Sequence, residues 1–146
     1  MERREFLAGL AATAAVAAAT QVIGEREARS DSAEMHPARY AALAQTSAHC
    51  VVAGDGCLRH CFGMLAMNDS SMAGCIRAAY DMVAVCGALQ SLAATNSDHV
   101  VALARAAIEA CGTCQKQCEK YPDVPECKAC AEACANNIQE CKKVLG

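Results

Sequence analysis

The sequence has few of the residues that build a conventional protein core. Aromatic residues make up 3% of its 146 residues, and there is no tryptophan. Leu, Ile, Val and Phe together number 25, whereas 33 residues are alanine and 12 are cysteine. So small a share of large apolar residues is typical of disorder only when the net charge is also high, and here it is −3. We therefore predict a small folded domain whose apolar core is thin.

Other absences exclude whole classes of protein. No apolar run suits a membrane span, no block of basic residues suits nucleic acid, and no strand-like alternation competes with helix. No Ser/His/Asp arrangement or pair of carboxylates is apparent, so we expect no enzyme. Four acidic residues are instead interpreted as facing solvent: Asp81, Asp98, Glu109 and Glu119.

The N-terminus has the pattern of an export signal. An Arg3-Arg4 pair precedes an alanine-rich apolar run that reaches Ala19. A charged start, an apolar middle and small residues near a cut site are typical of such a signal, and the arginine pair resembles the twin-arginine signal that exports folded proteins. We therefore predict a twin-arginine signal peptide over residues 1–23, a solvated tail over residues 24–38, and a mature protein in a bacterial periplasm without a membrane anchor.

The remaining residues, 39–146, predict an all-α domain. Four helix-prone stretches end at about Ala66, Ala94, Lys120 and Val144, the first beginning near Pro37, and they are separated by short joints rich in turn residues at 68–71, 95–98 and 121–126. Short joints make sequential helices antiparallel neighbours, so we predict an antiparallel up-down four-helix bundle. Gly54 and Gly56 count against the first helix, because each costs about 1 kcal/mol relative to alanine in a helix interior.

The joints also contain residues that are able to cap helices. Asp69 or Ser70 is placed to cap the second helix. Asp123 and Glu126 have the spacing of a capping box before the fourth. Pro125 is tolerated there, since the amides of the first turn have no partner within the helix.

The cysteines give the most specific signal. Neighbouring cysteines of one helix are 3, 4, 7 or 11 residues apart. At roughly 100° per residue, these steps return to a single stripe of the helix, which also holds apolar residues such as Met82. We therefore predict that all twelve thiols line the core of the bundle and are its metal ligands: Cys50, Cys57, Cys61, Cys75, Cys86, Cys111, Cys114, Cys118, Cys127, Cys130, Cys134 and Cys141.

Two conventional interpretations of such a core fit poorly. An exported chain with an even number of cysteines normally suggests disulfides, but cysteines four residues apart on a helix project side by side, which suits disulfide geometry badly. The paired segments Cys111–Cys118 and Cys127–Cys134 suggest iron–sulfur or zinc sites. Their ligands, however, are strung along helices rather than wrapped around one point, and the other six cysteines would have no role.

Copper(I) is the third interpretation and fits the pattern best. It is a soft ion that favours thiolate and thioether ligands, and two cysteines suffice to hold one ion. If each thiolate bridges two ions, the core reaches about one copper per thiol, on the order of a dozen, and is close to neutral. The empty core would contain neutral thiols, which pack as small apolar groups. One bundle can therefore exist empty or full, as a store requires.

One end of the predicted bundle gathers thioethers and a histidine. An up-down arrangement brings the first joint and the last joint together at that end. We predict a mouth there that passes copper inward, with packing in the core as the alternative for its methionines. Its residues are His60, Met64, Met67 and Met72. Three apolar residues would close the opposite end: Leu43, Leu89 and Val100.

Several of these segments carry a family resemblance. They are the twin-arginine start, the stretches His49–Cys61 and Met64–Asp69, and Cys127-Lys128-Ala129-Cys130. Together they resemble the exported copper storage proteins of methane-oxidising bacteria, over nearly the whole chain. The resemblance implies a cysteine-lined bundle that assembles as a homotetramer and holds many Cu(I) ions for a methane monooxygenase. It also implies the same four mouth residues.

Asn137 departs from the family pattern. It lies on the thiol stripe, where members of the family can carry a further cysteine. We expect it to lower the capacity slightly and to leave a polar gap near Cys141. Detoxification of copper, or its delivery by a chaperone to one client, uses the same chemistry and stays an alternative to storage.

Overall fold

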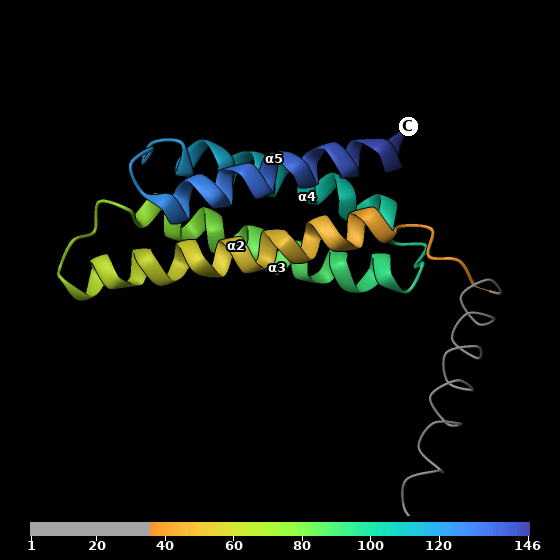
Figure 1. The fold of residues 1–146 in the computed structure, drawn as a ribbon, viewed down its shortest axis with the longest axis horizontal. Helices are drawn as coiled ribbons and strands as arrows, with labels where there is room; N and C mark the ends of the chain where they lie inside the picture. Colours follow the sequence, from red (N-terminus) through yellow and green to blue (C-terminus); the bar gives the residue numbers. More distant parts are fainter. Residues whose placement is uncertain (1–35) are drawn as a thin grey trace, which may run out of the picture. The chain divides into compact units, whose positions relative to one another are not determined.

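The fold is all-α. In a computed structural model, which describes residues 36–146, the chain forms four helices and, over that range, no strand (Figure 1). The helices are α2 (Ala41–Ala66), α3 (Ala73–Ala94), α4 (Val100–Cys118) and α5 (Pro125–Leu145). The predicted fold class is confirmed. The predicted signal peptide and most of the tail after it lie outside the described residues and stay predictions.

The four helices form an antiparallel bundle. Each helix packs against its two neighbours in the ring α2–α3–α4–α5, and no diagonal pair comes into close backbone contact. The joints 67–72 and 119–124 meet at one end, where the phenol of Tyr121 hydrogen-bonds the backbone of Ser71. We call this end the mouth. None of the four described helices combines the length and the hydropathy that a membrane span requires.

The first two helices do not begin as predicted. The first begins at Ala41 rather than near Pro37. The second follows Met72 with no side-chain cap, so the prediction of Asp69 or Ser70 as its cap is wrong. The Asp69 carboxylate instead accepts a hydrogen bond of 2.8 Å from the N–H of Ser71. This turn within the joint uses the carboxylate before the helix begins.

The fourth helix also begins without a side-chain cap. Its N-cap is Val124, and no hydrogen bond of the predicted capping box between Asp123 and Glu126 forms. Pro125 occupies the first turn, as predicted. Its fixed φ and missing N–H suit that position, so proline favours the start of the helix there.

Gly54 is required by the packing of α2 against α3. A Cβ at this position would overlap Cγ2 of Val83 and lie 2.7 Å from Cε of Met82. Gly56 differs, since a Cβ there would have no neighbour within 4 Å. Of the two glycines that count against the helix, one therefore allows a close approach of two helices, and the other only lowers helix propensity.

The core has two parts. The larger part contains eleven cysteines, packed with Leu58, Met72, Ala78, Ala79, Met82 and Ala133. We call its cysteines the thiol column: Cys50, Cys57, Cys61, Cys75, Cys86, Cys111, Cys114, Cys118, Cys127, Cys130 and Cys134. The smaller part is the closed end: Leu43, Leu89, Ala93, Val100, Ala104, Ala107 and Cys141. The predicted apolar closure by Leu43, Leu89 and Val100 is thus confirmed.

Candidate metal centre

All twelve cysteines are buried in the bundle as free thiols. Their exposed fractions do not exceed 1%. The predicted thiol stripe is therefore confirmed on every helix. The four acidic residues interpreted as facing solvent are exposed, as expected.

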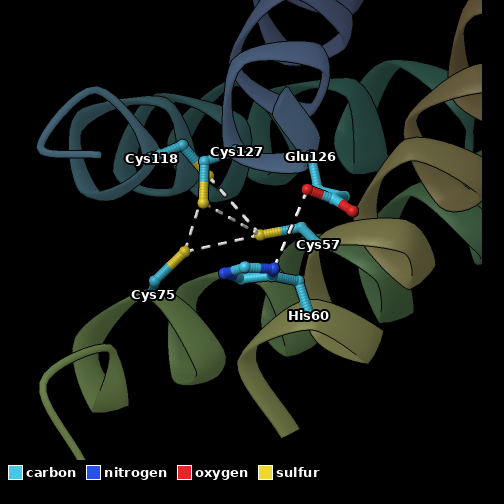
Figure 2. Close-up of polar contacts among 6 residues, drawn as sticks. All are labelled: Cys57, His60, Cys75, Cys118, Glu126 and Cys127. Carbon is cyan, nitrogen blue, oxygen red and sulfur yellow. Dashed lines mark hydrogen bonds and ion pairs between the residues drawn. The ribbon is translucent and has the colours of Figure 1, made fainter. Parts of the chain in front are cut away.

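The first group of sulfurs lies near the mouth and takes one cysteine from each helix. Figure 2 shows these sulfurs turned towards one another. Sγ of Cys57 lies 3.5 Å from Sγ of Cys75, 3.9 Å from that of Cys118 and 3.8 Å from that of Cys127. Cys75 and Cys118 are 3.6 Å apart. Four soft donors thus converge from four helices, at distances well beyond the roughly 2.05 Å of a disulfide.

Two more groups continue the column towards the closed end. In each, the three sulfurs lie within 4.8 Å of one another. The groups are Cys114, Cys130 and Cys134, and Cys50, Cys86 and Cys111. Sγ of Cys114 lies 3.6 Å from that of Cys130 and 3.9 Å from that of Cys118, so it joins the second group to the first. In the third group, Cys86 and Cys111 are 3.6 Å apart. The column is therefore a chain of neighbouring sulfurs rather than isolated sites.

Two cysteines lie outside these groups. Cys61 belongs to the column and lies on α2, one turn nearer the mouth than Cys57. Cys141 belongs to the closed end and packs among its apolar residues. The sequence placed both on the same stripe, but the structure places only Cys61 with the column.

A polar side chain, Asn137, lies one helical turn before Cys141 on α5. The buried Asn137 donates through Nδ2 to the sulfurs of Cys86 and Cys111, at 3.4 and 3.7 Å. Its Oδ1 accepts hydrogen bonds from Thr46 Oγ1 at 2.8 Å and Ser47 Oγ at 3.1 Å. The expected polar gap is therefore filled. Sequence reasoning missed the two hydroxyls, although they precede Cys50 by four and three residues and so share its stripe.

The predicted mouth residues lie at the mouth but differ in exposure. Met72 is buried against the column, Met64 packs against it in part, and Met67 is 69% exposed. His60 Nδ1 lies 3.8 Å from Oε2 of Glu126 across the gap between α2 and α5 (Figure 2). The three methionines thus form a series from solvent to core. The contact between His60 and Glu126 could not be predicted from the sequence.

Burial controls the protonation of thiols at both ends of the core. Loss of hydration is the main cause, and it raises the pKa of Cys61 to about 11 and the pKa values of Cys127 and Cys141 to about 12. These three thiols are therefore neutral near pH 7. Neutral thiols pack as small apolar groups, which allows a stable core before any metal binds.

Within the column, the sulfurs hydrogen-bond one another, and these bonds change their pKa values. Hydrogen bonds from Cys118 and Cys57 lower the pKa of Cys75 to about 3, because they stabilise its thiolate. The pKa of Cys118 is raised, with its hydrogen bond to Cys114 as the largest cause. In the first group Cys75 is thus the sulfur that accepts, whereas the pKa values of Cys57, Cys118 and Cys127 are raised. Soft ligands are already arranged there to exchange protons for a metal ion.

A buried row of thiolate donors is the ligand set that soft metals such as copper prefer. A sequence profile of the copper storage protein family matches residues 36–146. The chain belongs to this family. A comparison with curated proteins found no match. As a copper storage protein it needs many soft donors shielded from water, and the thiol column supplies them in three buried groups. The family stores copper and is not a family of enzymes.

Proposed function

We propose that this copper storage protein holds copper as Cu(I), at about one ion per thiol of the column. The observation that carries the proposal is the unbroken series of sulfur contacts, 3.5 to 3.9 Å long, from Cys57 to Cys130. Two-coordinate Cu(I) suits neighbouring thiolates on one helix or on facing helices. A tetrahedral metal would instead need four donors around each ion, as zinc sites do.

Charge balance supports filling of the whole column. A buried thiolate without a counter-ion is costly because it loses hydration. When one Cu(I) replaces one thiol proton, however, the net charge of the core does not change. Each ion bound releases about one proton, so metal binding is coupled to pH. The bundle can therefore exchange its protons for copper in many steps without accumulating charge.

We also propose export by the twin-arginine pathway to the periplasm, assembly as a homotetramer and supply of copper to a methane monooxygenase. The arginine pair at residues 3 and 4 and the family resemblance support export and supply. Large exposed apolar side chains support self-association: Val52, Phe62 and Tyr80. We propose no catalytic role, because the sequence shows no Ser/His/Asp arrangement or pair of carboxylates. Cell fractionation with N-terminal sequencing tests export, and sedimentation analysis tests the tetramer.

Anaerobic titration of the reduced protein with Cu(I), against a competing chelator, tests storage. We expect many tightly held ions, about one per thiol of the column. Saturation at one or two ions would favour a chaperone instead. Retention of zinc or iron through purification would favour metal clusters of another kind. A metal-responsive promoter together with copper that is never released would favour detoxification.

A further inference from the structure

Asn137 makes the last polar contacts of the thiol column. Its side chain is buried on α5 and reaches sulfurs of α3 and α4 through Nδ2 and hydroxyls of α2 through Oδ1. All four helices therefore meet at this one amide. No buried side-chain nitrogen or oxygen among the described residues lacks a hydrogen-bond partner. The layer is thus polar but complete.

The chemistry of thiolates fixes the orientation of this amide. Once copper has replaced their protons, Cys86 and Cys111 are thiolates that only accept hydrogen bonds, so they require the NH₂ group of Asn137 to face them. The carbonyl oxygen then faces Thr46 and Ser47, whose hydroxyls are able to donate. Two N–H groups meet two sulfurs, and two lone pairs meet two hydroxyls. The amide therefore has no donor or acceptor left for a metal ion.

Beyond this layer, the core no longer suits copper. Cys141 packs with Leu43, Leu89 and Val100 in the closed end. It belongs to none of the sulfur groups of the described residues. Cu(I) needs a second soft ligand, and the side chain between Cys141 and the column is a hydrogen-bonded amide. A lone thiol in an apolar cluster is a packing group rather than half of a site.

We propose that Asn137 ends the copper column, as a positioning residue that holds the sulfurs of Cys86 and Cys111 through its N–H groups, and that Cys141 binds no copper. This inference rests on the proposed storage of Cu(I). It limits the store to the eleven thiols of the column.

Removing Cys141, and separately a thiol of the column, tests whether the copper-binding core ends at Asn137. Cys141→Ala and Cys141→Ser should bind as many Cu(I) ions as the wild type in the anaerobic titration. Cys134→Ala, which removes a thiol of the column, should bind about one ion fewer. Loss of one ion from both Cys141 variants would overturn the boundary while storage stands. A wild type that saturates at one or two ions would instead overturn storage.

A near-isosteric change tests the positioning role. Asn137→Asp replaces the N–H donors by an acceptor that faces the thiolates. Loss of a hydrogen bond to a charged group costs enough to weaken retention of the innermost ions roughly tenfold or more in chelator competition. The matched control is Asn136→Asp, at the neighbouring exposed position, which should retain copper as the wild type does.

Chelator competition and unfolding together show whether Asn137 positions the sulfurs or only supports the fold. If Asn137 only fills space, Asn137→Asp will lower the unfolding midpoint of the empty protein and leave chelator competition unchanged, which would overturn the role. Should the aspartate variant not fold, Asn137→Ala removes the same donors without adding charge, and the same loss of retention is expected.

Discussion

The phenol oxygen of Tyr121 donates a hydrogen bond of 2.8 Å to the backbone carbonyl of Ser71. It joins the two joints that form the mouth, 50 residues apart in the chain. Tyr121 also packs against the thiol column. The contact therefore holds the mouth together, at a residue close to Cys61, Cys75 and Cys127.

Tyr121→Phe should load copper faster and release it faster to a chelator, because the joints separate more easily without this bond. The number of ions bound should not change, since no thiol is altered. A single hydrogen bond contributes about 1 kcal/mol, so the variant should also be slightly less stable. Stopped-flow absorbance of Cu(I) thiolates measures both rates. The control is Tyr80→Phe on the exposed face of α3, and equal rates in the two variants would exclude a role of the contact in uptake.

The mouth methionines should set the rate of loading but not the capacity. Thioethers bind Cu(I) more weakly than thiolates, so they are able to pass an ion onward. The triple variant Met64→Leu/Met67→Leu/Met72→Leu preserves apolar volume and should load more slowly to the same final stoichiometry. Met82→Leu, a buried methionine of α3 away from the mouth, is the matched control. Unchanged loading in the triple variant would mean that the methionines act as core filler.

The helical periodicity of the cysteines was sufficient to predict the bundle and the burial of all twelve thiols, because a repeat of 3, 4, 7 and 11 residues fixes the face of a helix. The periodicity does not fix how far along the bundle axis each cysteine lies. Cys141 is in phase with Cys134, yet it belongs to the apolar cluster of Leu43 and Val100 because the register between helices sets its level. The partners of Asn137 were missed for a related reason. The hydroxyls of Thr46 and Ser47 lie about 90 residues away in the chain and become its neighbours only through packing.

Replacing the two helical glycines by alanine should change the free energy of unfolding in opposite directions. Gly54→Ala should destabilise the empty bundle by about 1–3 kcal/mol, since the new methyl group meets Val83 and Met82. Gly56→Ala should stabilise it by about 0.5–1 kcal/mol, because the position is unobstructed and alanine restricts the unfolded chain. Urea unfolding of the reduced proteins gives both values. A neutral Gly54→Ala would show that the two helices are free to move apart at this level.

The stability of the empty bundle should decrease at alkaline pH. Unfolded cysteines ionise near pH 9.0, whereas burial raises the pKa of Cys61 to about 11 and the pKa values of Cys127 and Cys141 to about 12. Between these values the unfolded chain has lost protons that the folded chain still holds, so rising pH favours unfolding. The contribution of these thiols is complete below pH 9 and is lost as pH rises towards 12.

Anaerobic urea unfolding at a series of pH values measures this loss. In Cys141→Ala one thiol whose pKa burial raises to about 12 is absent, so the decrease between pH 9 and pH 12 should be shallower than in the wild type. The copper-loaded bundle should lack most of the decrease, because the thiols of the column have already exchanged their protons for metal. A stability that is independent of pH in the empty wild type would mean that its buried thiols ionise as freely as exposed ones.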